Sequence, residues 1–271
     1  MLREEYRQWR DWVYEHYPWA YALGTGVLAL AAWGLCRPLR RRPAWVWGGY
    51  MATLGIGALL EPCVDPASSL YGSVLAHGRR DKPLVALTFD DGPHPHNTPL
   101  ILEALAKAQA PATFFCLGSE ALSYPHLVRA MVAEGHLVGS HTFSHRNLLG
   151  CTPHTTRQEI EKGLLALETI LSRPPQYFRP PYGMRYPWTL EISRSLAQEA
   201  VLWSNCPRDW QEPGVETIKA RVLAALQPGD IILLHDGGGD RTQTAQALPG
   251  LIAAIRERGY QLARVDQLER A

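Results

Sequence analysis

Short apolar runs alternate with helix-like patterns from about residue 82 onward, and this alternation limits the fold more than any other feature. The runs predict strands at 84–87, 112–117, 136–139, 177–179, 200–203, 231–234 and 261–263, with helical patterns between them. Thr156 and Glu159 form a candidate capping box for the longest of these helices. Short buried strands that alternate with helices indicate a parallel sheet, and about seven such units favour a closed or nearly closed barrel. Because no G-x-G-x-x-G turn follows a strand, a dinucleotide site is not expected.

The first predicted strand ends on two adjacent carboxylates. Leu84-Val85-Ala86-Leu87 leads into Thr88-Phe89-Asp90-Asp91-Gly92-Pro93. Neighbouring Asp side chains repel each other and are costly to desolvate, so a strand end that carries both needs compensation. A divalent cation is the usual compensation. The alternative is an ordinary turn, since Asp-Gly-Pro is common in loops.

Polar residues follow several of the predicted strands at the same place in each unit. They are Asp90-Asp91, His141 with His145, Arg179, Asp209 and His235-Asp236. The carboxyl ends of the strands of a parallel barrel converge, and active sites lie there. His141 and His145 lie four residues apart, on one face if the segment is helical, and with one carboxylate they make a three-ligand set. Taken singly, each of these features has an ordinary structural explanation. The His pair is equally typical of surface polarity, Arg179 of a loop salt bridge and Trp210 of core packing.

Five segments, in this order, resemble the successive motifs of a known family. They are Thr88–Pro93, His141–His145, Arg179–Gly183, Asp209-Trp210 and Leu233–Asp236. The segments resemble the motifs of the polysaccharide deacetylases of carbohydrate esterase family 4, whose shared module is the NodB homology domain. The resemblance covers roughly residues 75–265. It implies an α/β fold, a distorted (β/α)7 barrel of the NodB type.

The same resemblance implies a role for each site residue. Asp91, His141 and His145 would bind a divalent cation, usually Zn²⁺, with Co²⁺ as another candidate. Asp90 would be the general base and His235 the general acid that protonates the departing amine. Supporting roles would fall to Arg179, which holds Asp90, to Asp209, which pairs with His235, and to Trp210, Leu233 and the backbone N–H of Tyr182, which surround the acetyl group.

The expected activity is metal-dependent removal of N-acetyl groups from a sugar polymer of the cell envelope. Peptidoglycan, poly-N-acetylglucosamine and chitin-like oligomers are the candidate substrates. The alternatives are an esterase that removes O-acetyl groups from a glycan, an amidohydrolase acting on a small non-sugar amide, and a non-catalytic protein that retains metal and binds carbohydrate. Since 27 basic residues face 26 acidic ones, bulk charge does not favour nucleic acid as a partner.

The first 60 residues predict a membrane anchor. Residues 17–36 carry no charge and are long enough to cross about 30 Å of hydrocarbon, and 43–60 form a second uncharged run. Arg37 and Arg40–Arg42 lie between the runs, which predicts a helical hairpin with a cytoplasmic turn. Residues 61–81 are then a linker, and 82–271 a catalytic domain on the exoplasmic side of the cell membrane. A cleaved signal peptide at Ala29-Leu30-Ala31 is the alternative, and the topology inverts if 43–60 does not span.

The five cysteines show no C-x-x-C and no regular spacing. That pattern excludes a disulfide framework and a thiolate zinc site. One bridge, between Cys151 and Cys206, is compatible with an exported domain.

Overall fold

The computed structural model describes residues 63–66, 68 and 70–270, and these contain a strand at each of the seven predicted positions. The strands are β1 (Leu84–Asp90), β2 (Thr113–Cys116), β3 (Leu137–Ser140), β4 (Tyr177–Phe178), β5 (Glu199–Ala200), β6 (Ile231–His235) and β7 (Gln261–Ala263). They form one sheet in the order β5-β4-β3-β2-β1-β6, and β7 pairs with β1. Every strand pair is parallel, as the alternation predicts.

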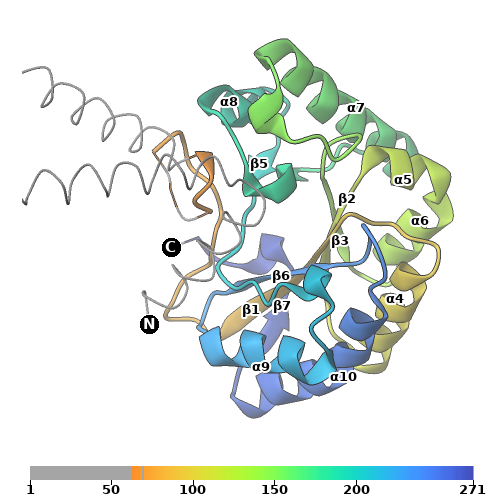
Figure 1. The fold of residues 1–271 in the computed structure, drawn as a ribbon, viewed down its shortest axis with the longest axis vertical. Coiled ribbons are helices and arrows are strands. Elements are labelled where there is room, and N and C mark those ends of the chain that lie inside the picture. The colour runs from red at the N-terminus through yellow and green to blue at the C-terminus, as the bar shows by residue number, and fades with distance from the viewer. Residues whose placement is uncertain (1–62, 67, 69, 271) are drawn as a thin grey trace, which may run out of the picture. The chain divides into compact units, whose positions relative to one another are not determined.

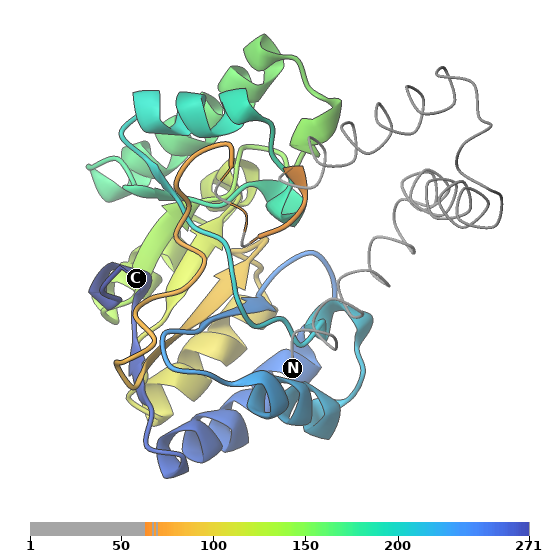
Figure 2. The same cartoon turned by 90° about the vertical axis from the view of Figure 1, so that its left-hand side faces the viewer.

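Helices cover the outer face of this curled sheet in two groups (Figures 1 and 2). The helices are α4 (Asn97–Lys107), α5 (Gly118–Ser123), α6 (Pro125–Ala133), α7 (Pro153–Leu171), α8 (Pro187–Ser195), α9 (Val215–Ala225) and α10 (Thr242–Glu257). One group contains α4, α9 and α10, and the other contains α5 to α8. Short 3₁₀ turns lie at Leu148–Gly150, Pro181–Gly183, Asp209–Gln211 and Val265–Gln267.

Strand β1 is buried on both faces, which explains why it reads as an almost continuous apolar run. Val85, Leu87 and Phe89 belong to the core between the sheet and the helices. Ala86 belongs to the second core, on the inner face, with Phe115 and Ile231. Because side chains alternate along a strand, Thr88 and Asp90 share the inner face with Ala86. Strand parity therefore turns the first carboxylate into the interior.

The sheet is a curled parallel half-barrel. The strand expected at 200–203 is reduced to the two-residue β5, and the chain beyond it stays extended without forming a regular ladder. Single parallel bridges join Val201 to Leu75 and Asn205 to Ile232 of β6. These bridges bring the segment after β5 toward β6, on the other side of the half-barrel.

The predicted membrane hairpin at 17–36 and 43–60 lies outside the described residues. Within the described ranges, no helix is long and apolar enough to span a bilayer. The described residues of the predicted linker 61–81 pack against the domain. Cys63 and Leu75 are buried, and both form backbone hydrogen bonds with the domain.

Two expectations drawn from the sequence are wrong. Cys151 and Cys206 are free thiols rather than a bridge, and burial raises the pKa of Cys206 to about 12. Helix α7 begins at Pro153, one turn earlier than the capping-box pattern predicts. The cap is Thr152, whose hydroxyl accepts a hydrogen bond from the Thr155 N–H at 3.2 Å. Glu159 does not cap the helix and instead accepts hydrogen bonds from Ser144.

Candidate active site and metal centre

The predicted site residues converge at the carboxyl edge of the sheet. Asp90, the last residue of β1, lies opposite His235, the last residue of β6, in the strand register. His141 follows β3 directly and Arg179 follows β4 directly. The Arg179 N–H donates to the Ser140 carbonyl at 2.9 Å, which ties these two strand ends together. The sheet thus brings together residues almost 150 positions apart in the chain.

Asp91, His141 and His145 form a cluster of potential metal ligands. One ligand atom from each lies within 4.8 Å of the others. Asp91 Oδ1 is 3.0 Å from His145 Nε2 and 3.4 Å from His141 Nε2. His141 is buried, whereas His145 is about a quarter exposed. A set of two imidazoles and one carboxylate leaves a coordination position open, as catalytic zinc sites do.

The protonation of His141 fits a cation between these atoms. Its Nδ1 lies 2.7 Å from the Arg179 carbonyl oxygen, which can only accept, so Nδ1 must carry the proton. In the neutral imidazole, which is the form that can ligate a cation, Nε2 then directs a lone pair toward the carboxylate. Asp91 Oδ1 is itself buried and accepts no hydrogen bond from the residues that the structure describes. Facing lone pairs of this kind are costly alone and are satisfied by a divalent cation, and the His141–carbonyl bond is the usual support for such a ligand.

The two histidines are not on a helix, contrary to the simplest reading of their spacing. Residues 141–147 form a loop in which Thr142 and His145 have left-handed backbones, with φ of 68° and 59°. The N–H groups of Gly118 and Ser119 in α5 donate to the carbonyls of Thr142 and Phe143 at 2.9 and 3.0 Å. Glu159 of α7 accepts hydrogen bonds from the Ser144 N–H and hydroxyl, each at 3.0 Å. Two helices thus hold the ligand loop in place.

Replacing Gly163 with Ala should weaken metal binding. Gly163 of α7 lies against the loop, and an added Cβ would come within 2.6 Å of the backbone of Thr142. The loop must move, so we expect a metal Kd at least about 10-fold higher, the range seen when the support of a ligand is lost. Alanine favours a helix over glycine by roughly 1 kcal/mol, so the melting temperature should change little in comparison.

The matched control for this substitution is Gly150→Ala, because a Cβ at Gly150 would meet no atom within 4 Å. Zinc titration of both variants gives the comparison. Equal zinc affinity in the two variants would mean that the packing of Gly163 does not position the ligands.

Asp90 is paired with Arg179 inside the half-barrel. Asp90 Oδ1 accepts from Arg179 Nη1 at 2.7 Å, and the guanidinium is fully buried. It also donates to the Thr88 hydroxyl and to the carbonyls of Val201 and Leu202, at 2.9, 3.3 and 2.9 Å, and lies 4.1 Å from the centre of the Phe115 ring. The Arg179 guanidinium therefore fixes the orientation of the Asp90 carboxyl and supplies a positive charge beside it.

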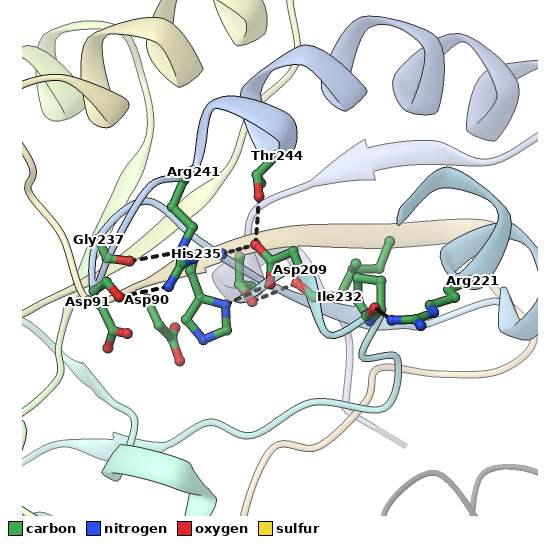
Figure 3. A network of polar contacts seen from close by, with 12 residues as sticks. Asp90, Asp91, Asp209, Arg221, Ile232, His235, Gly237, Arg241 and Thr244 are labelled. Carbon is green, nitrogen blue, oxygen red and sulfur yellow. Dashed lines mark hydrogen bonds and ion pairs between the residues drawn. The ribbon is translucent and has the colours of Figure 1, made fainter. Parts of the chain in front are cut away.

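His235 lies across the site from Arg179 and is held by Asp209. Figure 3 shows its ring between Asp209 on one side and Asp90 and Asp91 on the other. Its Nδ1–H donates to Asp209 Oδ1 at 2.8 Å, and the other carboxylate oxygen accepts from the Thr244 hydroxyl at 2.9 Å. Burial alone would lower the pKa of His235, but the charge and hydrogen bond of Asp209 outweigh it and raise the pKa to about 9. The imidazole is therefore cationic at neutral pH.

The remaining predicted residues surround these groups. The Trp210 ring lies edge-on to His235, with 5.1 Å between centroids. Leu233 is 3% exposed and shares the inner face of β6 with His235, two residues later. Tyr182 has a left-handed backbone, with φ of 60°, and its ring lies 4.7 Å from that of His145.

The residues under Asp91 were not assigned a role from the sequence. Asp236 is buried against Gly92, where a Cβ would come within 2.0 Å of its carboxylate, and it accepts from the Thr98 hydroxyl at 2.6 Å. Burial raises the pKa of Asp236 to about 7. A Cβ at Gly237 would likewise come within 2.0 Å of the Asp91 carbonyl oxygen. Arg241 donates to the Gly237 carbonyl at 3.0 Å (Figure 3). Gly92 and the glycines after His235 were the sequence signals for this close packing.

Comparison with known proteins identifies the family. The profile of the family described as Polysaccharide deacetylase matches residues 77–201. A chitooligosaccharide deacetylase of Bradyrhizobium sp. (strain ANU 289) is 41% identical over 199 residues, which cover 68% of this chain and 90% of that protein. The chain belongs to the polysaccharide deacetylase family. A peptidoglycan-N-acetylglucosamine deacetylase of Bacillus cereus is 38% identical over 189 residues, covering 69% of this chain and 88% of the relative.

Solved structures of polysaccharide deacetylases share the fold. The Bc1960 peptidoglycan N-acetylglucosamine deacetylase superposes with a TM-score of 0.70 and 33% identity, over 72% of this chain and 92% of that one. BA3943 of Bacillus anthracis, described as a family 4 pseudoenzyme, superposes with a TM-score of 0.69 and 25% identity, over 73% and 70% of the two chains. The fold of a polysaccharide deacetylase is therefore not sufficient for activity, and the site residues must decide it.

Proposed function

We propose that this protein is a metal-dependent hydrolase that removes N-acetyl groups from an N-acetylated sugar polymer. The observation that carries the proposal is the placement of a carboxylate base and a cationic acid on two sides of one ligand cluster. Asp90 is held by Arg179 at 2.7 Å, and His235 is held by Asp209 at 2.8 Å. The relatives are deacetylases of chitooligosaccharide and of peptidoglycan N-acetylglucosamine, which supports N-acetyl sugars as the substrate class.

The ligand set of Asp91, His141 and His145 suits Zn²⁺ best, since it combines two imidazoles with one carboxylate. A divalent cation, when bound there, supplies Lewis-acid polarisation of the acetyl carbonyl and lowers the pKa of water. Asp90, held by Arg179, accepts the proton of the attacking water. His235 donates its Nε2 proton to the sugar nitrogen, so that the amine can leave. Trp210 and Leu233 form an apolar wall suited to the acetyl methyl group, and the backbone N–H of Tyr182 is the donor for the carbonyl oxygen.

The decisive experiment is acetate release by the full chain across a panel of acetylated glycans, with metal content measured on the same sample. N-acetylglucosamine oligomers and peptidoglycan should yield acetate, and a chelator should stop the release until Zn²⁺ or Co²⁺ is restored. Acetate from O-acetylated xylan alone would establish the esterase alternative. If the fully metallated protein releases no acetate from any substrate, the result would favour the alternative of a non-catalytic protein that retains metal and binds carbohydrate.

Replacing His235 with Gln should slow N-deacetylation far more than ester hydrolysis. An amine leaves only after protonation, whereas the phenolate of an aryl acetate leaves without a proton. We expect kcat on an N-acetylglucosamine oligomer to fall about 10²–10⁴-fold, the contribution of a positioned general acid. Hydrolysis of the aryl acetate should fall much less. Equal losses on the two substrates would remove His235 from the role of acid.

The proposal includes a location at the cell membrane, with residues 1–60 as the anchor and the catalytic domain on the exoplasmic side. It is supported by the two uncharged runs and the four arginines between them. Reporters fused after Ala271 test it directly. A reporter that functions only outside the cytoplasm should be active when fused at this position. Activity of a reporter that functions only in the cytoplasm would contradict the topology.

A further inference from the structure

The segment that precedes the family match is fastened to the active-site edge. We call its described residues, 63–66, 68 and 70–76, the N-terminal strap; the match itself begins at residue 77. Arg185 is fully buried and holds one end of the strap. Its Nη2 donates to the carbonyls of Asp65 and Ser68 at 2.9 and 2.7 Å, and its backbone N–H donates to the Cys63 carbonyl at 2.9 Å.

The same guanidinium holds the turn that carries Tyr182. Arg185 Nη1 donates to the Gly183 carbonyl at 3.0 Å. Tyr182 and Gly183 are consecutive left-handed residues, with φ of 60° and 67°. A left-handed backbone is strained at a non-glycine residue, and it persists only when its surroundings determine it. Arg185 therefore links the strap to a turn whose conformation needs external support.

The other end of the strap contacts the backbone segment that orients Arg179, the partner of Asp90. Leu75 donates to the Ala200 carbonyl and accepts from the Leu202 N–H, both at 2.9 Å. The carbonyls of Val201 and Leu202, in the same stretch, are two of the acceptors that orient Arg179. The two ends of the strap thus contact the two backbone segments that place Tyr182 and the partner of Asp90.

We propose that the N-terminal strap is a working part of the active site, and that Arg185 is the positioning residue through which it fixes Tyr182. The proposal rests on the proposed function, in which the Tyr182 N–H is a donor to the acetyl oxygen. Three carbonyls from two segments converge on one buried guanidinium, so its planar fork selects a single relative placement of strap and turn. Loss of that placement moves the Tyr182 N–H away from the acetyl oxygen without touching Asp91, His141 or His145.

The test uses the full chain with Arg185→Lys and Arg185→Gln. A misplaced oxyanion donor should lower kcat by about 10-fold to 100-fold, with KM changed much less. Because the carbonyl oxygen is common to amide and ester, the loss should be the same for an N-acetylglucosamine oligomer and an aryl acetate, unlike the loss in His235→Gln. Zinc content should stay at that of the unsubstituted chain, and lysine should lose less than glutamine because it keeps the charge and some donors.

Hydrogen exchange gives a second readout that does not depend on turnover. Backbone amides at 182–185 should exchange faster in both Arg185 variants, while those of 141–145 should not. Arg264→Gln, at a partly exposed arginine, is the control, because Arg264 contacts Asp266 and the Gly135 carbonyl rather than the site.

Two results would overturn the strap proposal. One is an unchanged kcat in both Arg185 variants. The other is a kcat loss that merely tracks lost zinc or lost folded protein, which would make Arg185 a general structural residue. Failure of the proposed function is distinguishable, because the unsubstituted chain would then release no acetate from any substrate.

Discussion

Replacing Asp90 with Asn should abolish turnover while the protein keeps its metal. The amide cannot accept the proton of the attacking water, so we expect kcat to fall about 10²–10⁴-fold, the contribution of a positioned base. The amide oxygen can still accept from Arg179 Nη1, now 2.7 Å from Asp90 Oδ1, so the geometry should persist. The measurements are acetate release and zinc stoichiometry on the same sample.

Stability has to be followed in this variant, because Arg179 loses its charged partner inside the protein. Breaking a buried ion pair costs about 3–5 kcal/mol, which thermal unfolding will show. Asp230→Asn is the matched control: Asp230 is also buried and lies 2.6 Å from Arg80, but it precedes β6, whereas the site lies at the carboxyl end of that strand. That variant should lose stability and keep its specific activity. Loss of zinc from Asp90→Asn would mean that the roles of Asp90 and Asp91 are assigned wrongly.

Replacing His141 with Ala should release the metal itself. His141 is the buried imidazole of the cluster, and its Nδ1–H bond to the Arg179 carbonyl aims Nε2 at Asp91. Removing a ligand should weaken zinc binding by more than the roughly 10–100-fold that follows loss of a ligand's support. Activity should vanish at limiting zinc and return in part at excess zinc. Equilibrium dialysis against a zinc indicator measures the change.

His136→Ala is the matched control for that experiment. His136 is buried at the other end of β3, where its Nδ1 accepts from the Ala112 N–H at 3.2 Å. The substitution should lower stability but leave zinc affinity unchanged. Stoichiometric zinc in His141→Ala, at the affinity of the unsubstituted chain, would remove His141 from the ligand set.

The sequence predicted the site residues that lie at or directly after the carboxyl end of a predicted strand. A carboxylate pair after β1, imidazoles after β3, an arginine after β4 and a histidine at the end of β6 all follow from strand parity and a parallel sheet. The four-residue spacing of His141 and His145 left open whether the segment is helical, because such an interval does not distinguish a helix from a loop. Their approach depends on left-handed backbones at Thr142 and His145, which no glycine marks.

The sequence by itself determined the strands, their parallel arrangement and the residues proposed as base, acid and metal ligands, because these depend on local periodicity and on the order of motifs. Only the tertiary structure decided how these residues are held. Asp236 beneath Gly92, Gly163 against the ligand loop and Arg185 between the strap and the Tyr182 turn are contacts between distant segments. Residues 63–76 look like a linker in composition, since Pro and Ser there are typical of loops. Their attachment to the domain uses backbone carbonyls, which every residue has and which composition therefore cannot reveal.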